Sequence, residues 1–195
     1  MKQTLTSAAL MMGLTGMGAS AALAEAEAYT LDPSHSQVLF SYDHLGFSTT
    51  YGMFAGFEGE IMFDEENPGN SSVEVSMPLM SMFTGWEERE EHFMSEDFFD
   101  ASEDDMVTFT STGIEVTGED SAQITGDLTM NDVTKSVVLD TTLTQQAEHP
   151  MENKPWLGFE ATTTLLRSDF GVGDFAPMVS DEVEVRISLE AGKAE

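Results

Sequence analysis

Apolar and polar residues alternate with a period of two along most of the chain. Over residues 182–190 the alternation is strict, with aliphatic side chains at the odd positions and mostly charged ones at the even positions. Such a segment places one side in an apolar interior and the other in water, as a half-buried β-strand does. Comparable runs start near Val38, Phe57, Val73, Phe109 and Phe159. We therefore expect a fold built from many short strands.

Turn-forming clusters separate these runs. Examples are residues 67–70 (NPGN), 117–120 (TGED) and 171–174 (GVGD), which are rich in Gly, Pro, Asn and Asp. Many short strands joined in this way are typical of an antiparallel sandwich or a closed barrel. No linker or repeat interrupts the pattern, so we expect residues 25–195 to form one domain.

Residues 86–101 interrupt the alternation of apolar and polar residues. This stretch is rich in Glu, and its apolar residues fall near helical spacing. We predict one or two short helical turns across one end of the sheet, with an aromatic face turned inward and the glutamates at 87, 88, 90 and 91 in solvent. The aromatic side chains of this face are Trp86, Phe93, Phe98 and Phe99.

Residues 1–24 have the features of a secretory signal peptide. Lys2 gives a positive start, an apolar stretch follows over residues 5–17, and Ala22 and Ala24 supply the small residues of a cleavage site. We expect cleavage after Ala24, with Ala26 and Ala28 as alternative sites. A retained transmembrane helix is disfavoured, because a bilayer span takes about 20 mostly apolar residues and this stretch is interrupted by Gly, Thr and Ser.

The chain is strongly acidic, with 36 Asp and Glu against seven Lys and Arg and a formal net charge of −29. Such a surface repels phosphate backbones and anionic lipid headgroups, which argues against nucleic-acid binding and against membrane docking through a basic patch. Solubility in a saline or exported setting is the simplest explanation, since salt screens the self-repulsion. An acidic docking surface or a cation store is the alternative.

The chain has no cysteine. A secreted domain of this kind cannot use disulfides and must rely on its apolar core. Thiol catalysis and a lipidated N-terminal cysteine are excluded as well.

No catalytic motif stands out. The four histidines show no HxH pair or HExxH spacing, so we expect no metal site, and we expect His35 and His44 to orient loops by hydrogen bonding. The sequence also lacks the G-x-S-x-G pattern of a nucleophilic serine.

Arg89 and Arg167 are scarce bases among many acids. Structural ion pairs are the simplest expectation for both, for example Arg167 with Asp169 or Arg89 with a nearby Asp. The alternative is that one of them helps to define a barrel mouth or contacts a polar headgroup.

Several short blocks occur in order along the chain. They are DPSHS at residues 32–36, HLG at 44–46, REEHF at 89–93, DFFD at 97–100, GDLT at 126–129 and RSDFG at 167–171. In this order and spacing the chain resembles the YceI-like family over roughly residues 29 to 190.

Two positions depart from the pattern of that family. Asn131 and Asp132 stand where the hairpin turn usually has Gly, and Asp105 and Met106 stand where an aromatic residue and a proline often precede a strand. Asn and Asp tolerate left-handed backbone conformations, so we expect the hairpin turn to form. The second departure concerns local loop geometry and leaves the fold unchanged.

The resemblance implies an all-β fold, an antiparallel eight-stranded lipocalin-like barrel with short helical turns closing one end. Such a barrel is just wide enough for side chains or for one small ligand. Small residues at inward positions, among them Gly126, Ala161 and Thr163, would leave room that a packed core normally fills. The residues that we expect to line the lumen are Val38, Phe40, Tyr42, Phe57, Ile61, Phe63, Val75, Met77, Phe98, Phe99, Phe109, Leu128, Phe159, Leu165, Val185 and Ile187. The polar residues that we expect at the mouth or in structural roles are His35, Arg89, His92, Arg167 and Asp169.

The function that the resemblance implies is non-catalytic binding or carriage of a long isoprenoid-type lipid, such as a polyprenyl quinone, in the periplasm. We expect no cofactor besides this cargo, no nucleic-acid partner and no stable membrane anchor. The residues alone leave open a solid-core acidic module that contacts a membrane redox protein or a cationic partner. A hydrolase or isomerase acting on a lipid is a further alternative, which would need ionisable side chains inside the lumen.

Overall fold

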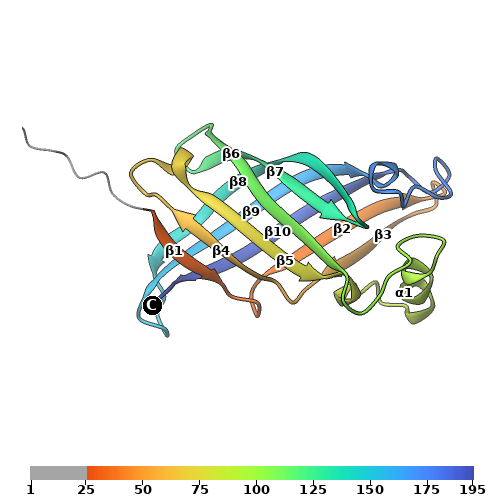
Figure 1. The fold of residues 1–195 in the computed structure, drawn as a ribbon, viewed down its shortest axis with the longest axis horizontal. Helices are drawn as coiled ribbons and strands as arrows, with labels where there is room; N and C mark the ends of the chain where they lie inside the picture. Colours follow the sequence, from red (N-terminus) through yellow and green to blue (C-terminus); the bar gives the residue numbers. More distant parts are fainter. Residues whose placement is uncertain (1–25) are drawn as a thin grey trace, which may run out of the picture.

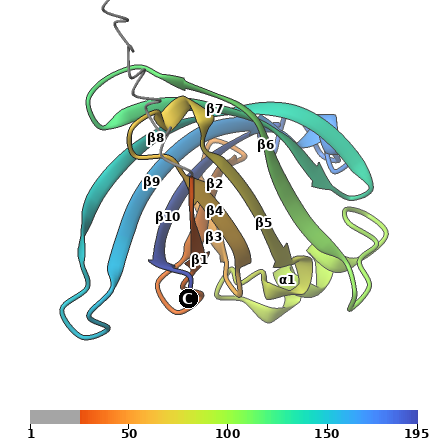
Figure 2. The ribbon, with the colours of Figure 1, turned by 60° about the vertical axis from the view of Figure 1, so that its left-hand side comes forward.

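The computed structural model describes residues 26–195, so the predicted signal peptide lies outside the described residues. None of the helices in this part of the chain is long and apolar enough to cross a membrane. Ten strands of these described residues form one sheet that wraps into a barrel, and α1 lies at one end of it (Figures 1 and 2). The strands are β1 (Glu27–Leu31), β2 (Gln37–His44), β3 (Ser48–Phe54), β4 (Glu58–Phe63), β5 (Ser72–Pro78), β6 (Met106–Val116), β7 (Ser121–Met130), β8 (Val133–Glu148), β9 (Pro155–Leu166) and β10 (Glu182–Lys193). The helical segments are η1 (Pro68–Asn70), η2 (Leu79–Ser81), α1 (Glu87–Met94) and η3 (Arg167–Phe170).

The sheet closes through its last strand. The order runs β1-β4-β5-β6-β7-β8-β9-β10, and β10 pairs with β1 to complete the ring. The other half of β10 pairs with β2, which in turn pairs with β3. β1 and β2 thus follow one another along β10 as two halves of one interrupted strand. The next position in the ring is divided in the same way, with β4 paired to β1 and β3 paired to β2. The ten antiparallel strands therefore occupy eight positions, which confirms the predicted eight-stranded barrel.

Both breaks follow from the local sequence. Between β1 and β2, Pro33 has no N–H to donate to the sheet, and Asp32 accepts hydrogen bonds from the backbone N–H and the hydroxyl of Ser34 at 2.9 and 2.6 Å. Between β3 and β4, Gly56 adopts a φ of +73°, which suits a residue without a Cβ atom. Each pair of half-strands can therefore bend and follow the curved wall.

The hairpin between β7 and β8 turns through the two residues that depart from the family pattern. Asn131 and Asp132 have φ values of 53° and 56°, and the flanking pair is Met130 with Val133. Positive φ at both central residues defines the tight turn whose twist matches that of the strands. The Asn131 side chain also donates a hydrogen bond to the Phe170 carbonyl at 2.9 Å. The prediction that Asn and Asp can form this turn is confirmed.

The helix α1 falls within the stretch that breaks the alternation. Glu90 is half-buried, and its carboxylate accepts hydrogen bonds from the backbone N–H groups of Thr84 and Gly85 at 2.6 and 3.1 Å. The Thr84 N–H is the main reason that the pKa of Glu90 lies below its ordinary value. Glu90 therefore anchors the start of the helix, whereas Glu87, Glu88 and Glu91 are exposed as expected.

The β7–β8 turn gives a stability test. Asp132 is exposed, so its backbone conformation is the feature that a substitution changes. Asp132→Val is expected to lower the free energy of unfolding by about 1–3 kcal/mol, because a β-branched residue is strained at positive φ. Asp132→Gly is the matched control and should leave stability equal or higher. Urea unfolding of both variants decides the point, and equal stabilities for Val and Gly would contradict it.

Candidate ligand-binding cavity

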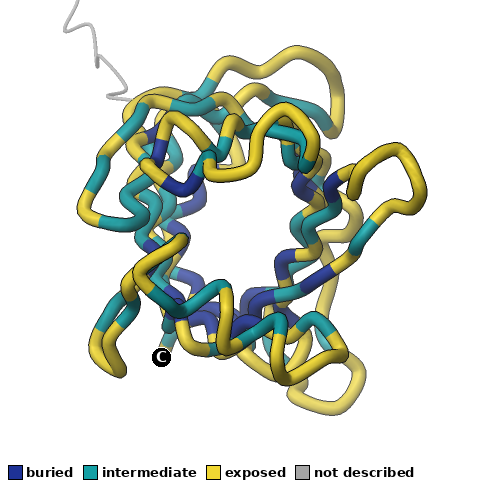
Figure 3. The backbone as a smooth tube through the Cα atoms, turned by 90° about the vertical axis from the view of Figure 1, so that its right-hand side faces the viewer, coloured by how far each residue is buried: buried dark blue, intermediate teal, exposed yellow. Residues whose placement is uncertain are grey.

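The barrel encloses a cavity of about 340 Å³. This volume lies at the lower end of the range of about 300–1,000 Å³ that is typical of ligand pockets. Every strand except β1 contributes to the lining, together with α1 and η3. Figure 3 looks along the ring of strands from the end that carries α1, with many of the buried positions on the wall. The cavity therefore runs through the interior of the fold.

The residues that the sequence placed in the lumen all line this cavity. Pairs of rings cover parts of its wall, with centroids 5.5 Å apart for Phe40 and Phe54 and 6.5 Å apart for Phe63 and Phe159. Whether a ligand touches these residues stays a prediction. The sixteen are Val38, Phe40, Tyr42, Phe57, Ile61, Phe63, Val75, Met77, Phe98, Phe99, Phe109, Leu128, Phe159, Leu165, Val185 and Ile187.

Sequence reasoning missed the contribution of β8. Val137, Leu139, Thr141 and Leu143 all line the cavity at every second position. The same period of two was available in the sequence, but the apolar Val138 between them obscured it. Val138 points outward and is 44% exposed.

Small inward residues do not all leave space. The ring of Phe109 lies over Gly126 and occupies the room that a side chain there would take. Ser111 likewise has a structural role, because its hydroxyl accepts a hydrogen bond from the Val73 N–H at 2.9 Å. Ala161 and Thr163 do line the cavity. The open volume therefore reflects the width of the closed barrel more than the number of small residues.

An aromatic cluster covers the α1 end of the cavity. The Phe93 ring lies 6.2 Å from Tyr42 and 5.2 Å from Phe98, and Phe98 lies 5.8 Å from Phe175 of the loop before β10. These rings connect α1 to the barrel wall. Trp86 is not part of the cluster, contrary to the prediction of an inward aromatic face that includes it. Trp86 is 56% exposed, because it precedes the helix and turns away from the barrel.

Arg167 lies at the same end and lines the cavity. The expected ion pair with Asp169 is wrong, since Asp169 pairs with Lys135 at 3.6 Å. The Arg167 guanidinium instead donates hydrogen bonds to four backbone carbonyls of the loop that leads to β10. The acceptors are Val172 at 2.7 Å, Ser180 at 2.9 Å, Val179 at 3.0 Å and Asp174 at 3.1 Å. Burial lowers the pKa of Arg167, and the nearby charge of Asp181 opposes this change.

The other predicted polar residues lie outside the cavity lining. Arg89 has no ion pair with an Asp among the described residues; its guanidinium lies 5.4 Å from the centre of the Trp86 ring and donates to the Thr84 carbonyl at 3.4 Å. His92 contacts Asp97 at 3.1 Å on the surface of the helical segment. Both residues shape the α1 segment.

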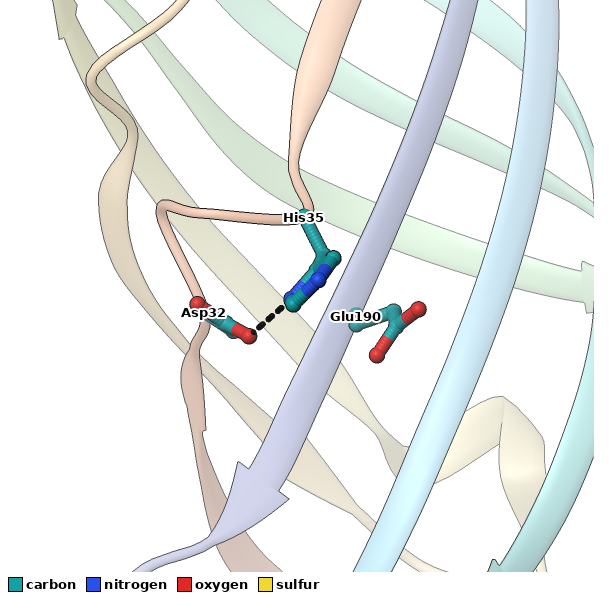
Figure 4. A group of neighbouring side chains, drawn as sticks. All are labelled: Asp32, His35 and Glu190. Carbon is teal, nitrogen blue, oxygen red and sulfur yellow. Dashed lines mark hydrogen bonds and ion pairs between the residues drawn. The ribbon is translucent and has the colours of Figure 1, made fainter. Parts of the chain in front are cut away.

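His35 lies in the turn between β1 and β2, where its Nδ1 atom is 2.7 Å from Asp32 Oδ2. Glu190 of β10 lies beside this pair (Figure 4), and the three side chains bring potential metal-ligand atoms within 4.8 Å of one another. The carboxylates already have partners, since Glu190 accepts a hydrogen bond from the Trp156 indole at 2.8 Å. The contact between His35 and Asp32 therefore orders the turn itself, which fits the expected loop-orienting role of His35, while the Asp32 N–H holds the turn to β10 by donating to the Glu190 carbonyl at 2.8 Å.

Comparison with known proteins places this geometry in context. Residues 29–191 match the YceI-like domain. A UPF0312 protein of Ectopseudomonas mendocina is 39% identical over 185 residues, which cover 94% of this chain and 95% of that protein. Among solved structures, Burkholderia cenocepacia BcnA aligns with a TM-score of 0.73 at 24% identity, covering 82% of this chain and 98% of that one. A polyisoprenoid binding domain from Saccharophagus degradans aligns with a TM-score of 0.63 at 14% identity, covering 86% and 99%. These two likenesses show a shared fold.

The contact between Asp32 and His35 predicts how the His35 imidazole titrates. The hydrogen bond and the charge of Asp32 hold the pKa of His35 above its ordinary value of 6.5. Protonated His35 thus stabilises the fold below that value, and the contribution is lost as pH rises through the raised pKa. Asp32→Asn should lower the His35 pKa towards 6.5, measured by NMR titration of the imidazole. Glu190→Gln should lower it less, because Glu190 acts only through its more distant charge. An unchanged His35 titration in Asp32→Asn would refute the hydrogen bond between the two side chains.

Proposed function

We propose that this chain, which belongs to the YceI-like family, binds one long isoprenoid-type lipid non-covalently inside its barrel and holds or carries it in the periplasm. The observation that carries the proposal is the cavity, which is about 340 Å³ in volume and lined almost wholly by aliphatic and aromatic side chains. An apolar chain is the ligand that such a wall favours, because binding removes apolar surface from water on both sides.

The energetics suit a long chain. Each buried methylene contributes about 0.8 kcal/mol. Association loses translational and rotational freedom worth about 4–15 kcal/mol, which the burial of roughly 5–19 such groups offsets. The isoprenoid class is supported by the Saccharophagus degradans protein, which has the same barrel and is described as a polyisoprenoid binding domain.

The periplasmic part of the proposal rests on the sequence. Its support is the signal-peptide pattern of residues 1–24, which includes Lys2 and the small residues at 22 and 24. Without a cysteine for lipidation, cleavage would release the barrel as a free protein.

Binding is favoured over catalysis by the distribution of charge along the cavity. In the part of the chain that the structure describes, its charged lining residues are Arg167 near α1 and Glu119 with Asp120 in the β6–β7 turn at the opposite end. A hydrolase or isomerase needs acid and base groups that converge on one bond. These residues are separated by the length of the barrel, so they do not form such a group.

The rival proposal is a solid-core acidic module that contacts a membrane redox protein or a cationic partner. It predicts a barrel filled by its own side chains and binding that weakens with salt. The open cavity is at odds with a barrel filled by its own side chains. The acidic surface is compatible with both proposals.

Native mass spectrometry of the protein, secreted and purified without detergent, tests the proposal. We expect a one-to-one adduct of lipid mass, which organic extraction would identify. Bare protein that also fails to take up added polyprenyl quinone would rule out the container and favour the interaction module.

A pair of variants on β9 tests where the lipid lies. Ala161 is buried and lines the cavity, whereas the next residue, Thr162, faces solvent. Ala161→Phe should reduce lipid occupancy at least about tenfold, because the new ring takes up space in the lumen. Thr162→Phe adds the same ring outside and should leave occupancy unchanged. Circular dichroism confirms folding, and full occupancy in a folded Ala161→Phe protein would contradict an internal site.

A further inference from the structure

The cavity differs in polarity between its two ends. At the end away from α1 it is bounded by acidic residues, Glu119 and Asp120. At the α1 end its lining includes Arg167 and the phenol of Tyr42. Between these ends the wall consists largely of apolar side chains. The polar head of a lipid could therefore accept hydrogen bonds at the α1 end, where Arg167 and Tyr42 carry donor groups.

Tyr42 lines this space, and its hydroxyl is available to a ligand. The residue is only 9% exposed, and its ring packs beside Phe93 at 6.2 Å. Among residues 26–195, no group hydrogen-bonds to this hydroxyl, while no fully buried polar side-chain atom lacks a partner. The hydroxyl therefore faces open space, and the space that Tyr42 lines is the cavity.

Arg167 is held rigidly and keeps one donor unused. A guanidinium carries five N–H groups. Four of them donate to the carbonyls of Val172, Asp174, Val179 and Ser180. The fifth belongs to Nη2 and has no acceptor among the described residues. A fixed side chain loses little freedom when a ligand accepts from this N–H.

The two donors lie beside the same segment of chain. Arg167 Nε donates to the Ser180 carbonyl at 2.9 Å. The Ser180 N–H donates to the Asp43 carbonyl at 3.0 Å, and the Asp43 N–H donates to the Ser180 hydroxyl at 3.0 Å. Asp43 directly follows Tyr42, so Ser180 connects the strand that carries the phenol to the guanidinium.

We propose that Tyr42 and Arg167 form the site for the polar head of the bound lipid, and that this head presents uncharged acceptor oxygens such as carbonyl groups. The inference rests on the proposed function. Acceptors fit because both residues offer donors. An uncharged head fits because Asp174 and Asp181 already lie near the guanidinium charge and because burying an anion in an apolar lumen is costly. The tail then extends away from α1 along the apolar wall.

Competition between matched lipids tests this site. A polyprenyl quinone and a prenyl hydrocarbon of equal chain length are offered in equal amounts, and native mass spectrometry gives the occupancy ratio. Wild type should favour the quinone. Tyr42→Phe keeps the ring and removes the hydroxyl, and it should lower the quinone-to-hydrocarbon ratio by roughly three- to tenfold, as expected for one lost hydrogen bond. A prenyl phosphate of the same length should bind no more tightly than the quinone.

Tyr51→Phe is the matched control, because it removes the same phenolic hydroxyl from a β3 residue that is 66% exposed and lies outside the cavity lining. Its ratio should equal that of wild type. Arg167 is not substituted, because its removal would leave four backbone carbonyls without their hydrogen-bond donor. An unchanged ratio in Tyr42→Phe, or a phosphate that outcompetes the quinone, would overturn the head site. If no lipid binds wild type at all, the proposed function itself fails.

Discussion

The structure depends on the pairing of one strand, β10, with three neighbours. Along its length β10 pairs with β9, while on its other side it pairs with β2 near its start and with β1 near its end. Residues 32–36 separate these two partners, and the Asp32 N–H donates to the Glu190 carbonyl at 2.8 Å within the gap. The turn therefore stays attached to the strand that it bridges. Without this double pairing the sheet would have two open edges, and its inner face would not enclose a separate volume.

Closure also explains why the interior is a cavity. Once eight strand positions fix the width of a barrel, its side chains either meet at the axis or leave a lumen. The inward rings pack against neighbours on the wall, as Phe40 does with Phe54 and Phe109 does over Gly126. Rings that lie along the wall do not fill the axis. The space is thus a product of the backbone geometry and of aromatic residues that pack sideways.

The sequence was informative where structure is local and periodic. Alternation identified the inward residues of most strands, and the Asn131-Asp132 turn followed from backbone preferences. It failed where partners come from distant segments. Asp169 is the carboxylate nearest to Arg167 in sequence, but the guanidinium binds carbonyls at 172–180, whose positions depend on how that loop meets Asp43. β8 was missed because Val138, an outward apolar residue, hid the period of two.

The same alternation separates the charge of the molecule from its lumen. On β10 the even positions carry Glu182, Glu184 and Glu190 outward, while Val183, Val185, Ile187 and Leu189 line the cavity. The acidic surface can therefore vary without changing the wall that a lipid tail contacts. Within residues 26–195, charged residues line the cavity only where strands end, at Arg167 on one side and at Glu119 and Asp120 on the other. If the barrel binds a lipid, the wall sets affinity for an apolar tail, and selectivity for the head must arise at these ends.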